Sequence, residues 1–213
     1  AVAKGRVAVI TGAAKGIGAA AALRLAAEGK RLCLFDRNEK ALHALVKKID
    51  TECAVVTGDV TSEVDLIRLR DTVLTEFGEV SLLINNAGIK DGGGPWDPPS
   101  AWRHQLEVNL ISMITMQHLF VPLMLAQNQK SAIVNLGSKE GITTPPGNAD
   151  YSAAKAGIKV LTEQLAHELL KTAGDKVTVN LLVPGYTWTD MNSPGLDETG
   201  TEKPAEAWTA SQG

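Results

Sequence analysis

Residues 11–18 read TGAAKGIG, and this stretch decides the fold. A short apolar run, RVAVI, precedes it, and a helix-forming stretch of small residues follows. Gly12 permits a sharp turn, Gly16 lets the backbone approach a pyrophosphate closely, and Gly18 lets the helix pack tightly against the strand. The helix N-terminus presents N–H groups and partial positive charge to phosphates. The pattern predicts a dinucleotide-binding turn, and a glycine-rich turn without a ligand is the alternative.

Outward from this turn, apolar runs of strand length alternate with longer amphipathic stretches. The predicted strands cover residues 6–10, 31–35, 54–57, 81–84, 132–136 and 177–183. The predicted helices cover residues 16–28, 39–49, 63–77, 101–126 and 151–172. The strand runs are mostly continuous in hydrophobicity, which is typical of a parallel sheet covered on both faces by helices. The alternation predicts an α/β fold with a doubly wound parallel sheet (Rossmann-type) in a single domain, with ligands outside the carboxyl ends of the strands.

Composition excludes several classes of function. The 213 residues suit one domain, and 44% apolar with 21% charged residues is ordinary for a globular protein. A net charge of −3 gives no reason to expect nucleic acid or an anionic membrane as a partner. We expect no apolar run that approaches the roughly 20 residues that span a bilayer, and no leader, because the first predicted strand begins almost at the start of the sequence. We therefore expect a cytoplasmic protein.

Cysteine and histidine usage agree with that expectation. Cys33 and Cys53 each fall in a predicted strand, so we interpret them as reduced core residues, with a disulfide between them as the disfavoured alternative. The four histidines show no metal-ligand spacing, so no metal site is expected.

Asp36 follows the second predicted strand, about 20 residues beyond the glycine turn. A carboxylate there is placed to accept hydrogen bonds from the hydroxyls of an adenosine ribose, and its charge repels a 2′-phosphate. Asp36 therefore favours NAD. Arg37 and Lys15 are cations that could partly neutralise a 2′-phosphate, so NADP is the alternative. The simpler interpretation of Asp36 is a turn residue at a strand end.

Further motifs follow in a fixed order. Residues 85–88 read NNAG, Tyr151 and Lys155 form a YxxxK pattern, and Ser138 stands thirteen residues before the tyrosine. Together with TGxxxGxG and Pro184-Gly185 after the last strand, this order resembles the short-chain dehydrogenase/reductase family of the compact, single-domain kind. The resemblance covers about residues 5–191.

Two features depart from the family pattern. Gly137 stands where a second serine is usual, a change we expect to be harmless because Ser138 keeps its spacing. Family members commonly continue with another helix and a seventh strand, whereas this sequence stops at Gly213. We therefore expect residues 1–213 to form one dinucleotide-binding and catalytic domain lacking that last helix and strand. Whether they are truncated or lie outside the given sequence is left open.

The resemblance implies the roles of the site residues. Tyr151 is expected to be the catalytic acid/base, with Lys155 lowering its pKa from one helical turn away. Ser138 is expected to hold the substrate oxygen, and Asn109 to hold a water that links Lys155 to solvent. The simpler interpretation of Asn109 is a polar residue hydrogen-bonded to helix backbone. The expected cofactor contacts are Gly12, Lys15, Gly16, Ile17, Gly18, Asp36, Arg37, Asp59, Val60, Asn86, Ala87, Gly88, Tyr151, Lys155, Pro184, Gly185, Thr187 and Thr189.

The resulting expectation is an oxidoreductase that transfers a hydride between NAD and a small secondary alcohol or ketone. The substrate pocket is expected to involve residues 91–96, 139–148 and 186–196, with Trp96, Trp188 and Met191 providing apolar contact. The alternatives are an NADPH-preferring ketoreductase, a catalytically idle dinucleotide-binding sensor or scaffold, and an epimerase or dehydratase, for which 213 residues leave too little room. The resemblance also implies a homotetramer built on the helices predicted at 101–126 and 151–172.

Overall fold

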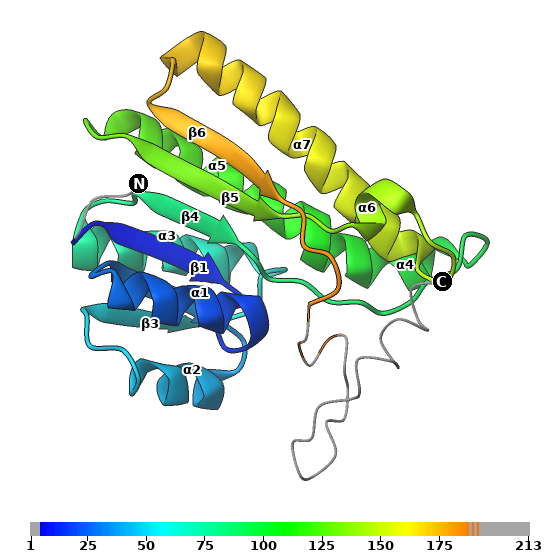
Figure 1. Cartoon of the computed structure of the whole chain (residues 1–213), viewed down its shortest axis with the longest axis horizontal. Helices are drawn as coiled ribbons and strands as arrows, with labels where there is room; N and C mark the ends of the chain where they lie inside the picture. The colour runs from blue at the N-terminus through cyan, green and yellow to red at the C-terminus, as the bar shows by residue number, and fades with distance from the viewer. Residues whose placement is uncertain (1–4, 188, 190, 192–213) are drawn as a thin grey trace.

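A computed structural model describes residues 5–187, 189 and 191 of the chain. Within these residues, six parallel strands form one sheet in the order β3-β2-β1-β4-β5-β6, with helices packed on it (Figure 1). This arrangement confirms the doubly wound, single-domain sheet expected from the sequence. The expected lack of a further helix and strand concerns residues beyond 191, which lie outside the described part.

The element bounds agree closely with the sequence pattern. The strands are β1 Val7–Thr11, β2 Arg31–Asp36, β3 Cys53–Thr57, β4 Leu82–Asn85, β5 Ser131–Leu136 and β6 Val177–Leu182. The helices are α1 Gly16–Ala27, α2 Glu39–Val46, α3 Glu63–Phe77, α4 Pro99–Leu106, the π-helix η1 Glu107–Ile111, α5 Ser112–Ala126, α6 Glu140–Thr143 and α7 Ala149–Ala173.

The strand order reverses between β1 and β4. From β1 the chain winds outward through β2 to β3, then returns to β4 on the other side of β1 and continues to β6. Such a reversal opens a crevice at the carboxyl ends of the central strands. The loops that follow β1, β2, β4, β5 and β6 all start at that edge, so it gathers residues distant in sequence.

Two apolar layers hold the helices to the sheet. On one face, Phe120 and Met116 of α5 and Leu69 of α3 pack against strand side chains, all almost fully buried. On the other face, Ala22 of α1 and Leu42 of α2 are buried against the sheet. The alanines of α1 bring that helix close to β1, which places its N-terminus beside the crevice.

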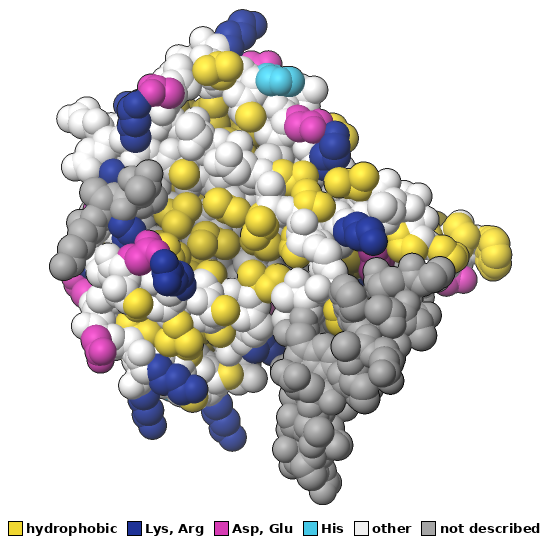
Figure 2. Space-filling view, viewed as in Figure 1, with side chains coloured by type: hydrophobic (Ala, Val, Ile, Leu, Met, Phe, Trp, Pro, Cys, Tyr) yellow, Lys and Arg dark blue, Asp and Glu magenta, His cyan; other side chains and the backbone are white. Residues whose placement is uncertain are grey.

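One part of the sheet has no helix over it within the described residues. On the face that α1 and α2 cover, the side chains of β6 point to solvent, and Leu182 is 48% exposed. Figure 2 shows hydrophobic side chains gathered on this side of the molecule.

The two cysteines are free thiols on neighbouring strands, and burial raises the pKa of Cys33 to about 12.

The helix predicted as one piece at 101–126 is interrupted. The π-helix η1 separates α4 from α5, and Asn109 and Val108 lie buried within it. A π-turn inserts one extra residue per turn and is frequent at functional sites, but hydrophobic spacing does not reveal it. The expectation that no apolar run approaches membrane-spanning length is wrong for one stretch of the described residues, because Pro99–Ala126 is long and apolar enough to cross a membrane. Its most apolar 18-residue window has a mean hydropathy of 1.5, and half of that window is buried in this fold. Its α5 part forms core, which accounts for its apolar composition.

Candidate active site

A cavity of about 910 Å³ opens at the carboxyl edge of the sheet. Its volume lies in the range of small-molecule and cofactor sites. All residues expected to carry the chemistry or to contact the cofactor line it, except Gly18 and Asn109. Those that do are Gly12, Lys15, Gly16, Ile17, Asp36, Arg37, Asp59, Val60, Asn86, Ala87, Gly88, Ser138, Tyr151, Lys155, Pro184, Gly185, Thr187 and Thr189.

The glycine turn is closed by the side chain of Asn86, which directly follows β4, the strand beside β1 in the sheet. Asn86 donates from Nδ2 to the carbonyls of Thr11 and Gly12 at 3.0 and 2.9 Å. Gly12 has φ +64°, and a Cβ there would stand 2.7 Å from the Cα of Ala87. A Cβ on Gly18 would stand 2.3 Å from the Gly12 carbonyl oxygen. Gly18 therefore acts from behind the cavity wall, by letting α1 approach the turn.

The same turn fits a pyrophosphate group. Gly16 begins α1 with φ +56°, and a Cβ there would point toward the Thr189 side chain at 3.4 Å, on the cavity side. A side chain would fill the cradle that glycine leaves open beside the helix N-terminus. Lys15 lines the cavity from the same turn and adds positive charge.

Asp36 is held by backbone donors on both sides. Its Oδ2 accepts from the Ala14 N–H at 3.0 Å, and its Oδ1 accepts from the Asn38 N–H at 2.9 Å. A carboxylate has about four acceptor sites, so capacity is left for hydroxyl donors from the cavity. Arg37 lines the same part of the cavity. The carboxylate and the cation thus face one binding space, as both cofactor interpretations require.

Asp59 and Val60 form the cavity wall after β3. Asp59 accepts from the backbone N–H and the hydroxyl of Thr61 at 2.9 and 2.8 Å. These hydrogen bonds, the backbone N–H foremost, lower the pKa of Asp59. The carboxylate is therefore engaged in its own turn, and Val60 provides apolar surface.

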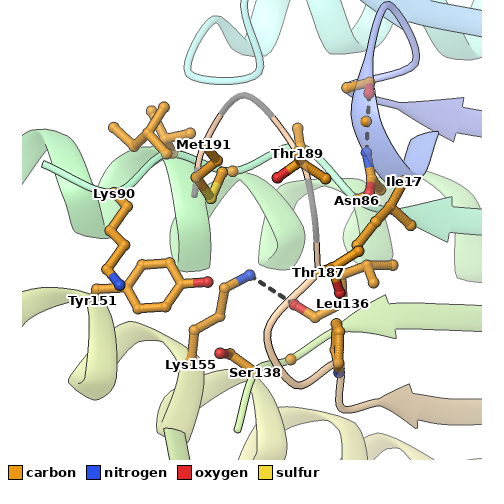
Figure 3. Close-up of a pocket in the computed structure, with 18 of the residues that line it drawn as sticks. Ile17, Asn86, Lys90, Leu136, Ser138, Tyr151, Lys155, Thr187, Thr189 and Met191 are labelled. Carbon is orange, nitrogen blue, oxygen red and sulfur yellow. Dashed lines mark hydrogen bonds between the residues drawn. The ribbon is translucent and has the colours of Figure 1, made fainter. Parts of the chain in front are cut away.

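The three residues expected to carry the chemistry meet at one end of the cavity. Tyr151 and Lys155 lie one turn apart on α7, and Ser138 follows β5. Figure 3 shows the Tyr151 hydroxyl pointing toward the Lys155 ammonium, with Ser138 beside them. Lys155 is buried, and its Nζ donates to the Leu136 carbonyl at 2.7 Å. Its ammonium lies 5.6 Å from the centroid of the Tyr151 ring.

Burial decides the ionisation of this pair. It raises the pKa of Tyr151, and the carboxylate of Glu140 raises it further, while hydrogen bonding with Ser138 lowers it. Burial also lowers the pKa of Lys155 to about 8. We expected Lys155 to lower the pKa of Tyr151. In the protein alone, the removal of both groups from water disfavours both charged forms and sets the direction of both shifts. The lowering of the Tyr151 pKa by Lys155 stays a prediction.

Asn109 lies fully buried behind the cavity wall. Its Oδ1 accepts from the Ile89 N–H and its Nδ2 donates to the Ile89 carbonyl, both at 2.8 Å. Both ends of the amide are thus used on the backbone of the segment after β4, and not on helix backbone as in the simpler interpretation. A Cβ on Gly88 would meet the Asn109 oxygen at 3.1 Å and Lys155 Nζ at 3.8 Å, so the amide lies near the lysine. The water expected there stays a prediction.

The sequence did not indicate the contacts that two charged residues, Lys90 and Glu140, make at the site. Lys90 follows the NNAG motif, and its Nζ binds Glu140 Oε1 at 2.6 Å and lies 5.4 Å from the centroid of the Tyr151 ring. Glu140 stands two residues after Ser138, within the expected substrate segment 139–148. Their positions directly after two motifs are the only sequence signal they leave.

The expected substrate segments are partly confirmed. Residues that line the cavity from them are Asp91, Lys139, Glu140, Thr143, Pro145, Pro146, Asn148, Tyr186, Thr187, Thr189 and Met191. The expectation for Trp96 is wrong, because its side chain is 89% exposed and does not line the cavity. Trp188 and residues 192–196 lie outside the described part. These segments contribute more polar side chains to the cavity than the sequence suggested.

Comparisons with known proteins agree with this geometry. The family model described as short chain dehydrogenase matches residues 6–199. A 3-oxoacyl-(acyl-carrier-protein) reductase of Thermotoga maritima is 34% identical over 192 residues, 88% of this chain and 76% of that protein. A short-chain dehydrogenase/reductase of Burkholderia phymatum in complex with NAD is similar with a TM-score of 0.85 and 34% identity, over 98% of this chain and 78% of that one. Actinorhodin polyketide ketoreductase with NADPH gives 0.82 and 31%, over 88% and 73%.

Proposed function

The chain belongs to the short-chain dehydrogenase/reductase family of nicotinamide-dependent oxidoreductases, and from this premise we propose that it interconverts a small secondary alcohol and a ketone. The proposal is supported by one cavity whose lining holds the glycine turn at one end and Ser138, Tyr151 and Lys155 at the other. A bound nicotinamide would supply or accept the hydride. The protein has to supply a proton carrier at the same carbonyl.

In this proposal the chain's own residues move the proton and hold the substrate. Ser138 donates a hydrogen bond to the reacting oxygen and keeps it against Tyr151. Tyr151 gives its phenolic proton to that oxygen in the reducing direction and takes it back in the oxidising direction. At pH values below its own pKa of about 8, Lys155 carries a positive charge beside the phenol of Tyr151. Charge developing on the substrate oxygen is thus met by two fixed hydroxyl donors.

We further propose that the cofactor is NAD rather than NADP. The Asp36 carboxylate on the cavity wall, held by two backbone N–H groups, supports this choice because it repels a 2′-phosphate. Arg37 and Lys15 line the same space and favour the NADPH-preferring alternative. The named structures similar to this chain hold NAD in one case and NADPH in the other.

Asp36→Ala tests the cofactor choice. We expect kcat/KM for NADP relative to NAD to rise about tenfold or more, because a like charge beside the 2′-phosphate is removed. Asp36→Asn serves as the control, since it removes the charge and retains an acceptor for the Ala14 N–H. An unchanged cofactor ratio in both variants would contradict the NAD proposal.

The direct test of function is a fluorescence titration with NADH and NADPH, followed by turnover assays. The substrate panel should pair each simple ketone with a hydroxylated analogue, because Asp91, Lys139 and Glu140 line the same cavity as Tyr151. Tighter binding of NADH, with turnover of at least one ketone, is the expected result. Tight binding without turnover on a broad panel would favour the idle sensor.

We propose that the protein is a cytoplasmic homotetramer whose only other partners are small alcohol or carbonyl compounds, with no nucleic acid or membrane. Exposed apolar side chains on the helices expected at the interface support the oligomer. Ile111 and Ile114 are each 42% exposed, and Val160 on α7 is 56% exposed. Contacts between like copies would remove these surfaces from water.

Ile114→Glu tests the assembly. A charge buried in a contact between copies is expected to dissociate the tetramer, which light scattering coupled to size exclusion measures as a fall in mass. Val64→Glu is the matched control, because Val64 is also an exposed apolar residue but lies on α3, outside the expected interface. A monomeric wild-type protein would refute the assembly.

A further inference from the structure

Lys90 lies on a segment after β4 whose backbone is fixed on both sides. Asn109 binds both the N–H and the carbonyl of Ile89 at 2.8 Å. Gln105 donates to the same carbonyl and accepts from the Asp91 N–H, both at 2.9 Å. Both amide side chains are fully buried. The direction in which the Lys90 side chain leaves this segment is therefore set by α4 and η1.

Glu140 is fixed just as firmly from the other side of the site. It begins α6, two residues after Ser138, and Gly141 follows it. A Cβ on Gly141 would stand 2.6 Å from the backbone carbonyl carbon of Lys155. This close approach is possible only with glycine, and it holds α6 against the helix that carries Tyr151.

The two side chains meet beside the Tyr151 ring. Lys90 Nζ lies 2.6 Å from Glu140 Oε1, and the two side chains are 22% and 24% exposed. The same ammonium lies 5.4 Å from the centroid of the Tyr151 ring, about as far as Lys155 at 5.6 Å. Figure 3 shows Lys90 reaching the ring from the opposite end to the hydroxyl. A cation over an aromatic ring is attracted by it and favours negative charge on it.

Glu140 acts on the phenol in the opposite direction. Its carboxylate raises the pKa of Tyr151, after the larger effect of burial. Its Oε2 is buried and has no hydrogen-bond partner within the described residues, so the Lys90 ammonium is its main compensation. If Lys90 lost its charge, the carboxylate would act on Tyr151 without opposition.

Other charged groups lie on the elements around Tyr151. They are Lys155 and Asp150 on α7, Lys139 before α6, Asp91 on the segment after β4, and His104 on α4. Asp150 is buried; its Oδ1 accepts from the Tyr151 N–H at 2.7 Å, and its Oδ2 has no hydrogen-bond partner within the described residues. Asp91 is paired with His104 at 2.9 Å, and Lys139 is exposed. Lys90 and Glu140 are thus the pair that brings charge to the ring from outside α7.

We propose that Lys90 and Glu140 are positioning residues of the active site, and that their balance of charge sets the fraction of Tyr151 that is ionised at a given pH. The pair neither gives nor takes the proton. It shifts the equilibrium of the phenolic O–H bond that breaks when Tyr151 protonates the substrate oxygen. The inference rests on the proposed function in taking Tyr151 as the proton carrier.

The ionisation of Tyr151 can be read without cofactor or substrate. The chain has two tyrosines, so Tyr186→Phe leaves Tyr151 as the only phenol. The ultraviolet absorbance of the phenolate, followed against pH in this background, then reports Tyr151 alone. Circular dichroism at each pH checks that the fold is retained.

In this background we expect opposite shifts from the two partners. Glu140→Gln lowers the midpoint by about 1 pH unit, and Lys90→Met raises it by a similar amount. Lys90→Arg keeps the positive charge and holds the midpoint near that of the background. Lys139→Met is the matched control, since it removes an exposed lysine of the same cavity and leaves the midpoint unchanged.

Equal midpoints in Glu140→Gln and Lys90→Met would overturn the inference. If Lys90→Met fails to fold, the nearly isosteric Glu140→Gln decides alone. An equal shift in Lys139→Met would also overturn it, because it would show a general charge effect rather than this pair. Opposite shifts, together with full turnover in Tyr151→Phe, would support the charge balance while contradicting the proposed function, so the two failures are distinguishable.

Discussion

Tyr151→Phe is expected to lower turnover at least about 100-fold while leaving cofactor affinity within about twofold, the loss that follows removal of a general acid. The hydroxyl lies beside Lys155 and Ser138 at the end of the cavity, and phenylalanine keeps the ring that packs there. Steady-state kinetics on any active ketone and a fluorescence titration with NADH measure the two quantities separately. The idle-sensor alternative predicts no turnover in wild type or variant.

The neighbouring residue supplies a matched control for this experiment. Ser152→Ala also removes one hydroxyl from α7, but the Ser152 oxygen is buried without a hydrogen-bond partner in the described part of the chain and does not line the cavity. We expect its turnover to equal that of wild type. A Tyr151→Phe enzyme as active as Ser152→Ala would contradict the role of the phenol.

Gly18→Ala is expected to lower the free energy of unfolding by about 3 kcal/mol and to weaken NADH binding strongly, although Gly18 does not line the cavity. The added methyl would stand 2.3 Å from the Gly12 carbonyl oxygen and 2.6 Å from Asn86 Nδ2. The Gly12 carbonyl belongs to backbone, so α1 or the turn has to move. Urea denaturation and the NADH titration measure the two effects.

Gly78→Ala provides the comparison for a glycine without a clash. Gly78 ends α3 with φ +69°, and nothing lies within 4 Å of an added Cβ. Its substitution should cost about 1 kcal/mol of backbone strain and leave NADH binding unchanged. Equal effects on binding from both variants would mean that the Gly18 contact does not shape the cofactor site.

The order of strands and helices could be predicted because it depends on local pattern. The continuous apolar runs and their spacing locate all six strands to within about two residues. The glycine turn located the start of α1, and the alternation of strands and helices predicted a doubly wound parallel sheet, whose strand order the tertiary structure shows. The three glycines also predicted a close approach of backbone, which the space around Gly12 and Gly18 bears out.

Most of the cavity lining could also be predicted, since the carboxyl ends of parallel strands share one edge. Asp36 and Ser138 follow different strands and still line one space. The hydrogen-bond partner of Asn109 could not be predicted from the sequence. The π-turn that directs its side-chain amide toward Ile89 leaves no signal in the hydrophobic periodicity. The glycine at position 137 could not be explained from the sequence either. In the folded chain, a Cβ on Gly137 would stand 2.9 Å from Leu181 Cδ1.

The sequence by itself determined the element order, the edge at which the site lies and the residue types available there. Only the tertiary structure decided the electrostatics of Tyr151. Lys90 and Glu140 are 50 residues apart and meet only because α4, η1 and α6 are packed in place. The pKa of a phenol depends on how much water and charge surround it, and both are set by every element around it rather than by the spacing of a motif.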